Sequence, residues 1–224
     1  QREKIDKSRS VMKKVIFPIE AALAGAVLKE KGHAVIPFDL NLFEDEESLK
    51  NDFLSILSDF QPHVVASLPQ MLTFLITENV NDTNNLFYLA KQFDKEIKTV
   101  YGGMYATSLP VSALARSGAD AVICGEFEEL LGDIVDDDLF TDRGDEIKGL
   151  IRRGNVEAPN TPRHIANLDL LPMPAYKEFS YDRYFQYPGR GNLRYPEKSR
   201  SYTHYQTSRG CPGKCCFCNV SNST

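Results

Sequence analysis

Short apolar runs alternate with amphipathic stretches along the first 135 residues. The apolar runs are rich in β-branched residues and have the length of buried strands, whereas the stretches between them place apolar residues at helical spacing. The sequence therefore predicts five strands, at 13–17, 34–38, 63–67, 97–101 and 121–124. It predicts helices at 19–31, 46–60, 84–94, 109–117 and 127–135.

Two residues mark the expected ends of helices. Gly32 follows the first predicted helix at the position where a C-terminal cap glycine belongs. Pro62 follows the second predicted helix and cannot continue it, because proline lacks the backbone N–H that a helix interior needs.

Strands that are separated by helices predict a doubly wound, Rossmann-like parallel sheet that is covered on both faces. Ligands of such sheets bind beyond the carboxyl ends of the strands. The sequence after these ends reads Pro18–Ile19–Glu20, Ser67–Leu68–Pro69, Gly102–Gly103–Met104 and Gly125–Glu126–Phe127. Glycine there lets the backbone pass close to a large flat ligand, although glycine after a strand is also ordinary turn chemistry.

Residues 136–200 differ from the first part and predict a connector. The prolines at 159, 162, 172 and 174 favour an extended chain, and a short strand or hairpin is expected at Gly149–Asn155. Aromatic residues follow in a cluster, for which a wrapped linker is favoured over a stacking platform: Tyr181, Tyr184, Phe185, Tyr187, Tyr195, Tyr202 and Tyr205. We expect an α/β domain over 1–135, a connector over 136–200 and the start of a second domain over 201–224.

Composition places the chain among ordinary globular proteins. Of its 224 residues, 42% are hydrophobic and 25% are charged. No run approaches the ~18 apolar residues of a membrane span, and the basic N-terminus lacks the apolar core of a secretory signal. The absence of an initiator Met indicates a trimmed chain. We expect a cytoplasmic setting.

The net charge of −5 is unevenly distributed. Residues 126–146 are acidic, whereas the stretch from Lys177 to Lys214 is mainly basic. Both regions are typical of solvated surface, and the basic one could also face an anionic substrate or cofactor. The interleaved basic and aromatic repeat of nucleic-acid modules is absent, so the sequence does not indicate nucleic-acid binding.

Four of the five cysteines lie between positions 211 and 218. A disulfide framework would distribute them along the chain, whereas a tight group indicates metal binding. Cys124 stands alone at the end of an apolar run and is expected to be a buried structural thiol.

Cys211, Cys215 and Cys218 have the spacing C-x3-C-x2-C. Three thiolates on one loop can hold a four-iron cluster and leave one iron free to chelate a small molecule. Cys216 is interpreted as a bystander. A zinc site lacks its second cysteine pair, and a redox interpretation of Cys215 and Cys218 lacks a thioredoxin-like context, but both remain alternatives.

The motif TSRGCPGKCCFC at 207–218 resembles the first strand and cluster loop of radical SAM enzymes. Further upstream, the stretches at 25–40, 100–110 and 119–135 resemble the cobalamin-binding domain that precedes the barrel in one large branch of that superfamily. The passage NLDLLPMPAY at 167–176 resembles the junction between the two domains. The likeness extends over nearly the whole chain.

The resemblance implies that Cys211, Cys215 and Cys218 ligate a 4Fe-4S cluster, whose free iron binds S-adenosylmethionine. Reductive cleavage would then produce a 5′-deoxyadenosyl radical. It also implies cobalamin as a methyl carrier over the carboxyl ends of the strands, with these contacts: Ser67, Leu68, Gly102, Gly103, Gly125 and Glu126. The second domain would be the start of a TIM-type barrel.

Two departures limit this resemblance. The motif D-x-H-x-x-G, which supplies a histidine ligand in cobalamin-dependent mutases, is absent, so cobalamin would bind without one. Only six residues follow Cys218, so most of a barrel is missing and this chain alone is expected to be inactive.

Three functions remain open from the sequence. The first is a cobalamin-dependent radical SAM methyltransferase acting on an unactivated carbon or phosphorus centre. The second keeps the radical chemistry but performs cyclisation, rearrangement or oxidation. The third is a non-catalytic α/β binding module with a zinc-binding cysteine tail. For the enzymes, the expected partners are a small, natural-product-like substrate and an electron donor such as flavodoxin or ferredoxin.

Overall fold

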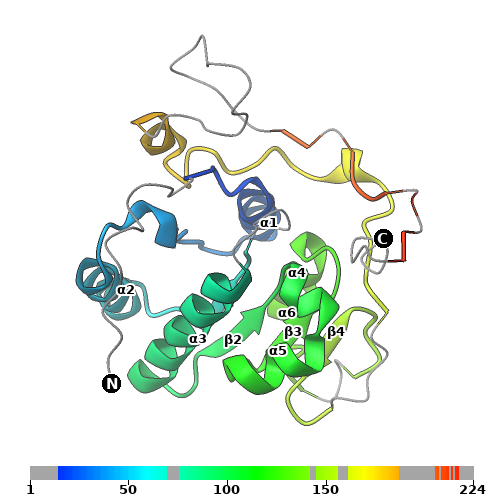
Figure 1. Ribbon diagram of the computed structural model, residues 1–224, viewed down its shortest axis with the longest axis horizontal. Coiled ribbons are helices and arrows are strands. Elements are labelled where there is room, and N and C mark those ends of the chain that lie inside the picture. Colours follow the sequence, from blue (N-terminus) through cyan, green and yellow to red (C-terminus); the bar gives the residue numbers. More distant parts are fainter. Residues whose placement is uncertain are drawn as a thin grey trace.

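The computed structural model describes residues 15–69, 76–141, 145–155 and 161–186, with 205, 206, 208–211, 213, 215 and 216. Its helices are α1 (Ile19–Glu30), α2 (Glu46–Phe60), α3 (Ile76–Phe93), α4 (Met104–Ser108), α5 (Pro110–Ser117) and α6 (Glu128–Asp137). Its strands are β1 (Val64–Ser67), β2 (Lys98–Tyr101), β3 (Ala121–Ile123) and β4 (Leu150–Arg152) (Figure 1). Short 3-10 helices are η2 (Leu40–Leu42), η4 (Leu168–Leu170) and η5 (Tyr181–Gln186).

The four strands form one sheet in the order β1-β2-β3-β4. The first three are parallel, as the sequence predicts, and β4 pairs antiparallel with β3. β4 lies within the predicted strand or hairpin at 149–155, where Arg152 also bridges to Asn155. The predicted α/β fold with a parallel sheet is therefore confirmed.

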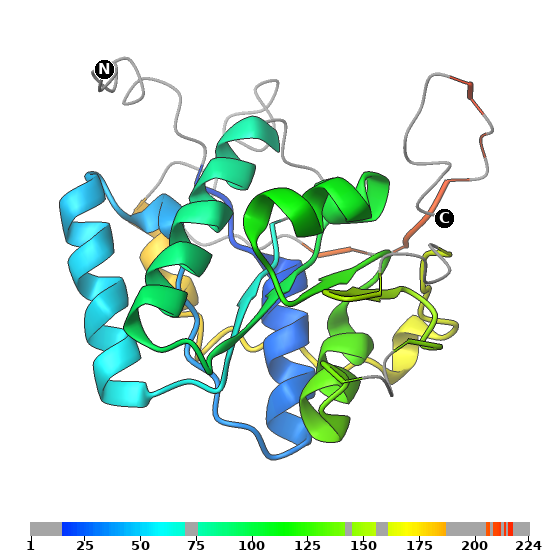
Figure 2. The same ribbon diagram turned by 90° about the horizontal axis from the view of Figure 1, so that it is seen from below.

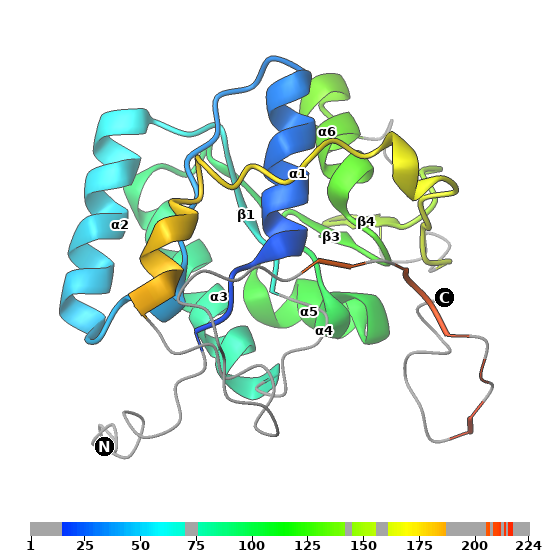
Figure 3. The same ribbon diagram turned by 90° about the horizontal axis from the view of Figure 1, so that it is seen from above.

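Helices cover both faces of the sheet. Figure 2 shows α1 and α6 on one face and α3, α4 and α5 on the other, and Figure 3 shows the first pair from its own side. Alternation along the strands sends neighbouring side chains to opposite faces, because the side-chain period of a strand is two. Val100 accordingly packs in the cluster under α6, whereas Tyr101 packs against α3, α4 and α5.

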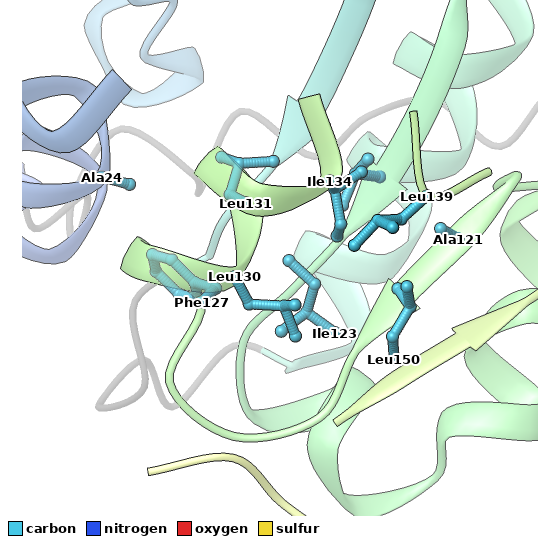
Figure 4. Packing of buried hydrophobic residues seen from close by; sticks show 10 residues of the cluster. Ala24, Ala121, Ile123, Phe127, Leu130, Leu131, Ile134, Leu139 and Leu150 are labelled. Carbon is cyan, nitrogen blue, oxygen red and sulfur yellow. The ribbon is translucent and has the colours of Figure 1, made fainter. Parts of the chain in front are cut away.

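The core beneath α6 consists of apolar side chains. Figure 4 shows Leu130 of α6 pointing toward Ile123 of the sheet, and Leu131 and Ile134 belong to the same buried cluster. Leu130, Ile134 and Ile123 have no exposed surface. Burial of each such side chain stabilises the fold by about 1.5–3 kcal/mol relative to its exposure.

Local signals account for the helix ends. At the end of α1, His33 N–H donates to the Leu28 carbonyl at 3.0 Å and Gly32 N–H donates to the Lys29 carbonyl at 2.9 Å. This is a Schellman cap, and Gly32 has the positive φ of 90° that it needs. At the start of α2, the Asp45 carboxylate accepts from Ser48 N–H at 2.7 Å.

The prediction of a strand at 13–17 is wrong for its described part, residues 15–17. Ile19 N–H donates to the Phe17 carbonyl at 2.9 Å, so the chain turns directly into α1 instead of continuing as a ladder partner. Pro18 offers no N–H to such a ladder. The side chain of Phe17 is instead stacked on Tyr176 with ring centroids 5.3 Å apart.

The prediction of a strand at 34–38 is also wrong, because these residues have no ladder partner in the described sheet. Pro37 cannot donate a ladder hydrogen bond, and Ile36 is 45% exposed rather than buried in a second layer. The apolar run at 34–38 therefore serves as a connection from α1 toward η2. Sequence reasoning also missed α4 and began α3 eight residues late, at 84 instead of 76.

Residues 174–185 wrap around the start of α1. Ala175 N–H donates to the Ala22 carbonyl at 3.0 Å, and Tyr184 donates to the Asp39 carboxylate at 2.6 Å. Phe17 is the centre of an aromatic cluster whose other rings are Tyr176, Phe179, Tyr181 and Tyr184. These contacts place part of the predicted connector against the start of α1, while the predicted division into domains stays a prediction.

Within the described part of the chain, none of the helices combines the length and the apolar composition that crossing a membrane requires.

Candidate functional site

The ends of β1 and β2 bring four of the predicted site residues together. Gly102 N–H donates to the Ser67 carbonyl at 2.9 Å, which extends the ladder by one step beyond β2. A Cβ placed on Gly102 would lie 3.0 Å from Cδ2 of Leu68. Gly103 follows with a φ of 93°, and a Cβ there would lie 2.6 Å from the Pro69 carbonyl oxygen. Gly103 is therefore needed where its backbone passes close to that of Pro69, whereas a side chain at Gly102 would press on the Leu68 and Phe127 side chains.

Hydroxyl groups gather under the same edge. The Ser67 and Thr83 hydroxyls are 2.7 Å apart and share a hydrogen bond. The Tyr101 hydroxyl and the Asn84 side-chain oxygen are buried without a hydrogen-bond partner among the described residues. Burial raises the pKa of Tyr101 to about 12, so the phenol is neutral. Buried polar groups of this kind are normally satisfied by protein, water or ligand.

The end of β3 is occupied by the chain itself. Gly125 forms a parallel bridge with Arg163, and Arg163 N–H donates to the Cys124 carbonyl at 2.9 Å. A Cβ on Gly125, whose φ is 96°, would lie 2.2 Å from the Arg163 carbonyl oxygen. The backbone of the connector lies at the end of β3, where the sequence predicts a flat ligand. A cofactor contact of Gly125 stays a prediction.

Glu126 and Glu128 form an acidic pair at the start of α6 that holds Arg209. The Arg209 guanidinium contacts Glu126 Oε1 at 3.2 Å through Nη1 and donates to Glu128 Oε1 at 2.5 Å through Nη2. Glu126 also accepts from the Ile165 N–H, at 2.5 Å. Glu126, predicted as a cofactor contact, is therefore engaged by two protein donors.

A second link joins α1 to the same segment. Gln206 donates to Glu20 Oε1 at 2.7 Å and accepts from Arg209 Nε at 3.2 Å. In Figures 2 and 3 the chain around residue 206, drawn in orange-red, passes the N-terminal end of α1. Glu20 and Glu128 lie in the first turns of their helices, where the helix dipole favours a negative charge.

Burial and charge act in opposite directions on this network. Glu128 is 2% exposed, and burial raises its carboxyl pKa, while Arg209 opposes that rise. For Arg209, burial acts to lower the pKa, but the charges and hydrogen bonds of Glu128 and Glu126 prevail and raise it. The guanidinium is therefore charged at any ordinary pH, and it compensates the buried carboxylate.

The loop that carries the cysteines is partly described. A Cβ on Gly213 would lie 3.3 Å from the Cys211 sulfur and 3.7 Å from the Cys215 sulfur, so both sulfurs flank this glycine. Cys211, Cys215 and Cys216 are exposed free thiols. Cys218 lies outside the described residues. Within the described residues alone, no group of three His, Cys, Asp or Glu side chains is arranged around a metal position.

Cys124 is separate from this loop. It is completely buried beneath α4, and burial raises the pKa of its thiol to about 12. The prediction of an inert structural thiol is confirmed in its burial.

The residues present fit the two cofactor types that the sequence implies. At the ends of β1 and β2, the backbone of Gly102 and Gly103 lies at the edge where a large flat ligand such as cobalamin would bind. At the cysteine loop, two exposed thiols on one side of a glycine are the donors that an iron–sulfur cluster uses. Sequence reasoning named both groups, but it missed the pairing of Arg209 with Glu126 and Glu128. A local signal for this pairing is the presence of two acids, Glu126 and Glu128, at the start of α6 directly after an apolar strand.

Comparison with known families gives one match that covers more than half of the chain. Residues 9–135 match the family described as B12 binding domain. Among curated proteins, the chain is 26% identical over 182 residues to the uncharacterized methyltransferase PH0819 of Pyrococcus horikoshii. The match covers 79% of this chain and 35% of that protein, so the chain spans about a third of this relative's length.

Two solved structures share the fold. Both are of TsrM, a radical S-adenosylmethionine methyltransferase from Kitasatospora setae, at 19% identity. The structure with cobalamin and a [4Fe-4S] cluster bound superposes with a TM-score of 0.52 over 72% of this chain and 29% of that one. The structure with tryptophan and a SAM analogue bound has a TM-score of 0.51 over 62% and 26%.

Proposed function

Because the chain belongs to the B12-binding domain family over residues 9–135, we propose that it forms the front part of a cobalamin-dependent radical SAM methyltransferase. The observation that carries this proposal is the contact between the segment that precedes the cysteines and the carboxyl edge of the sheet. Arg209, two positions before Cys211, is bound to Glu126 and Glu128 at the carboxyl edge of the sheet. A cysteine loop on the ligand-binding edge is the arrangement that chemistry between two cofactors requires.

We assign cobalamin to the carboxyl ends of β1 and β2. Ser67, Leu68, Gly102 and Gly103 would hold it. When bound, cobalamin supplies a transferable methyl group. None of the described histidines is needed as a ligand in this proposal, and His33 is already engaged by Asp136 at 2.7 Å.

We assign a 4Fe-4S cluster to Cys211, Cys215 and Cys218. The free iron would bind the amino and carboxylate groups of S-adenosylmethionine, and an electron donor such as flavodoxin or ferredoxin would supply the electron for its cleavage. The exposure of Cys211 and Cys215 is consistent with a cluster that is covered by another part of the protein. Thiolate donors in this number leave one iron open.

For the reaction we propose methyl transfer to an unactivated centre of a small, natural-product-like substrate. The similarity to a protein named as a methyltransferase supports this class over cyclisation, rearrangement or oxidation. We also propose a cytoplasmic location, where thiols remain reduced and available to iron.

The test is anaerobic reconstitution of the chain with iron, sulfide and hydroxocobalamin, followed by iron quantitation and a visible spectrum after gel filtration. We expect about four irons per chain and a retained corrin spectrum. Cys211→Ala should abolish iron binding, whereas the matched control Cys216→Ala should keep it.

Three outcomes would change the proposal. Iron without corrin would leave a radical SAM enzyme and remove cobalamin-dependent methyl transfer. Corrin without iron, in a longer chain that includes the rest of the protein, would remove the cluster. Tight zinc binding that depends on Cys211 and Cys215, with no stable cluster, would support a non-catalytic binding module.

A further inference from the structure

We propose that Arg209 is the positioning residue of this protein: by bridging Glu126 and Glu128, it fixes the cysteine-bearing segment against the carboxyl edge of the sheet. The bridge is a property of the folded chain, independent of any bound cofactor. Its consequence for catalysis, the placement of a cluster relative to cobalamin, rests on the function proposed above.

The geometry uses all three nitrogens of the guanidinium. Nη1 contacts Glu126 at 3.2 Å, Nη2 donates to Glu128 at 2.5 Å, and Nε donates to Gln206 at 3.2 Å. Arginine presents its donors in a rigid planar fork, whereas lysine is a point charge on a flexible stem. The site therefore discriminates between these two cations in a way that a surface ion pair does not.

The burial of the pair makes the bridge strong. Glu128 has 2% of its surface exposed, and the side chain of Arg209 has 16% exposed. A buried carboxylate that loses its partner is left uncompensated, which is strongly unfavourable. The folded sheet domain thus presents a preformed negative site that one guanidinium completes, and it holds the segment at that point.

Glu126 connects this bridge to the rest of the chain. One carboxylate oxygen accepts from the Ile165 N–H and the other contacts Arg209, so the connector and the cysteine segment meet on one side chain. Gln206 adds a third element through its 2.7 Å hydrogen bond to Glu20 of α1. The segment is therefore held at two residues, which fixes its direction as well as its position.

The bridge also restricts the position of Cys211, because only one residue separates Arg209 from this cysteine. Cys211 follows Arg209 by two residues, so its Cα lies within about 7–8 Å of the Arg209 Cα, because consecutive Cα atoms are about 3.8 Å apart. A docked Arg209 therefore confines the first cysteine to the carboxyl edge. Without the bridge, the segment keeps the Gln206–Glu20 hydrogen bond, which lies three positions before Arg209.

Trypsin cleavage after residue 209 measures this docking directly, in the chain free of iron and cobalamin. Trypsin must bind the Arg209 side chain, which is unavailable while it is docked. Lys177, in a turn of the connector that is packed on α1, serves as the internal reference for general opening of the chain. We expect cleavage at Arg209 to be at least about tenfold slower than in a free peptide of residues 205–213, corresponding to a stabilisation of 1.4 kcal/mol.

Variants separate the bridge from general stability. Glu126→Gln combined with Glu128→Gln should raise the ratio of cleavage at 209 to cleavage at 177 about tenfold, since hydrogen bonds to charged groups contribute about 1.5–3 kcal/mol. Glu129→Gln is the matched control, because Glu129 lies on the same helix but pairs with Arg163, and it should leave the ratio unchanged. Arg209→Lys, which trypsin also cleaves, should raise the ratio without any change in the sheet domain.

The proposal is overturned if residue 209 of the unaltered chain is cleaved as fast as in the free peptide, or if the double variant behaves as Glu129→Gln does. If circular dichroism shows that the double variant does not fold, Arg209→Lys decides alone: an unchanged ratio overturns the proposal. Because the assay contains no cofactor, failure of cobalamin or iron binding leaves its outcome unaffected, and the two proposals fail separately.

Discussion

Helix α6 is held to the rest of the protein by two kinds of contact. Along its length, the helix is packed on the sheet by Leu130, Leu131 and Ile134, which contact other apolar side chains (Figure 4). At its N-terminus, Glu128 is buried as well, but its contact is with the charged Arg209. The apolar packing requires only neighbouring side chains of suitable size, whereas the contact of Glu128 requires a guanidinium at one particular position.

This difference separates stability from placement. Apolar burial is roughly proportional to area and has no preferred direction, so it secures the layers of the domain. A guanidinium between carboxylates is directional, and it contributes little when its geometry is lost. We infer that the sheet core keeps the domain folded and that the charged edge determines where the cysteine segment lies. Each prediction below changes one side of this comparison.

The largest effect is expected from the apolar side. Leu130→Ala should lower the free energy of unfolding by about 2–5 kcal/mol, because the residue has no exposed surface and its removal leaves a cavity. Urea denaturation followed by circular dichroism measures the change. Leu170→Ala is the control, since Leu170 is 76% exposed and should change stability by less than about 0.5 kcal/mol.

The second largest loss of stability is expected from a substitution at Gly125, which lies beside Glu126 at the carboxyl edge of the sheet. Gly125→Ala should destabilise the chain by about 1–3 kcal/mol more than Gly32→Ala does. Both glycines have a positive φ, but a Cβ at Gly32 has nothing within 4 Å, whereas at Gly125 it meets the Arg163 backbone. Unfolding midpoints of the two variants give the comparison. Equal losses would mean that the contact between β3 and residue 163 is not formed.

The next effect, the change of stability with pH that Glu128 causes, should be smaller than these two losses. Its sign should be opposite to that of the surface acids. Burial raises its folded pKa above the ordinary value of 4.5, so the folded state binds the proton more tightly than the unfolded state. Its contribution to stability is therefore present at low pH and is lost as pH rises from about 4.5 through the folded pKa, by at most about 1.4 kcal/mol per pH unit.

Subtracting the stability curve of Glu128→Gln from that of the parent chain isolates this slope. Arg209 and Glu20 act on the same carboxyl group and are unchanged in the variant. The hydrogen-bonded surface acids have lowered pKa values instead, so their contributions are lost as pH falls: Asp45, Asp136, Asp145 and Glu178. A difference curve that rises with pH above 4.5 would contradict the burial of Glu128.

The smallest effect is expected at the far end of α6. Asp136→Asn removes contacts to Lys31 at 2.6 Å and to His33 at 2.7 Å, but all three side chains are about one-third exposed. Solvent and salt screen such pairs, so the variant should differ slightly from the parent chain at low ionic strength and match it in high salt. A salt-independent loss would show that this cluster resembles the buried edge.

The sequence predicts those parts of the fold that depend on neighbours along the chain. The period of apolar positions located α2, and Gly32 marked the end of α1, because both signals act within a few residues. The strands at 13–17 and 34–38 were predicted from their β-branched composition alone. Whether such a run joins a ladder depends on a partner that is distant in the sequence. Here prolines 18 and 37 cannot donate a ladder hydrogen bond, and Phe17 packs in the aromatic cluster instead.

For the candidate site, the sequence predicts residues but not the partners that the fold gives them. The strand ends and the cysteine loop follow from spacing and chemistry. The pairing of Arg209 with Glu128 joins residues that are 81 positions apart, and the Gln206–Glu20 hydrogen bond joins residues 186 positions apart. Local patterns contain no information on such pairs, because the folded sheet brings them together.

The aromatic cluster around Phe17 has a consequence for the order in which the protein folds during synthesis. Helix α1 leaves the ribosome early, yet its start is covered by rings from 176–184. Closing a loop of this length costs little more entropy than closing a shorter one, but it requires the later residues to exist. The start of α1 is therefore covered only after the connector has been made, and the nascent chain exposes this apolar surface until about residue 185 has emerged.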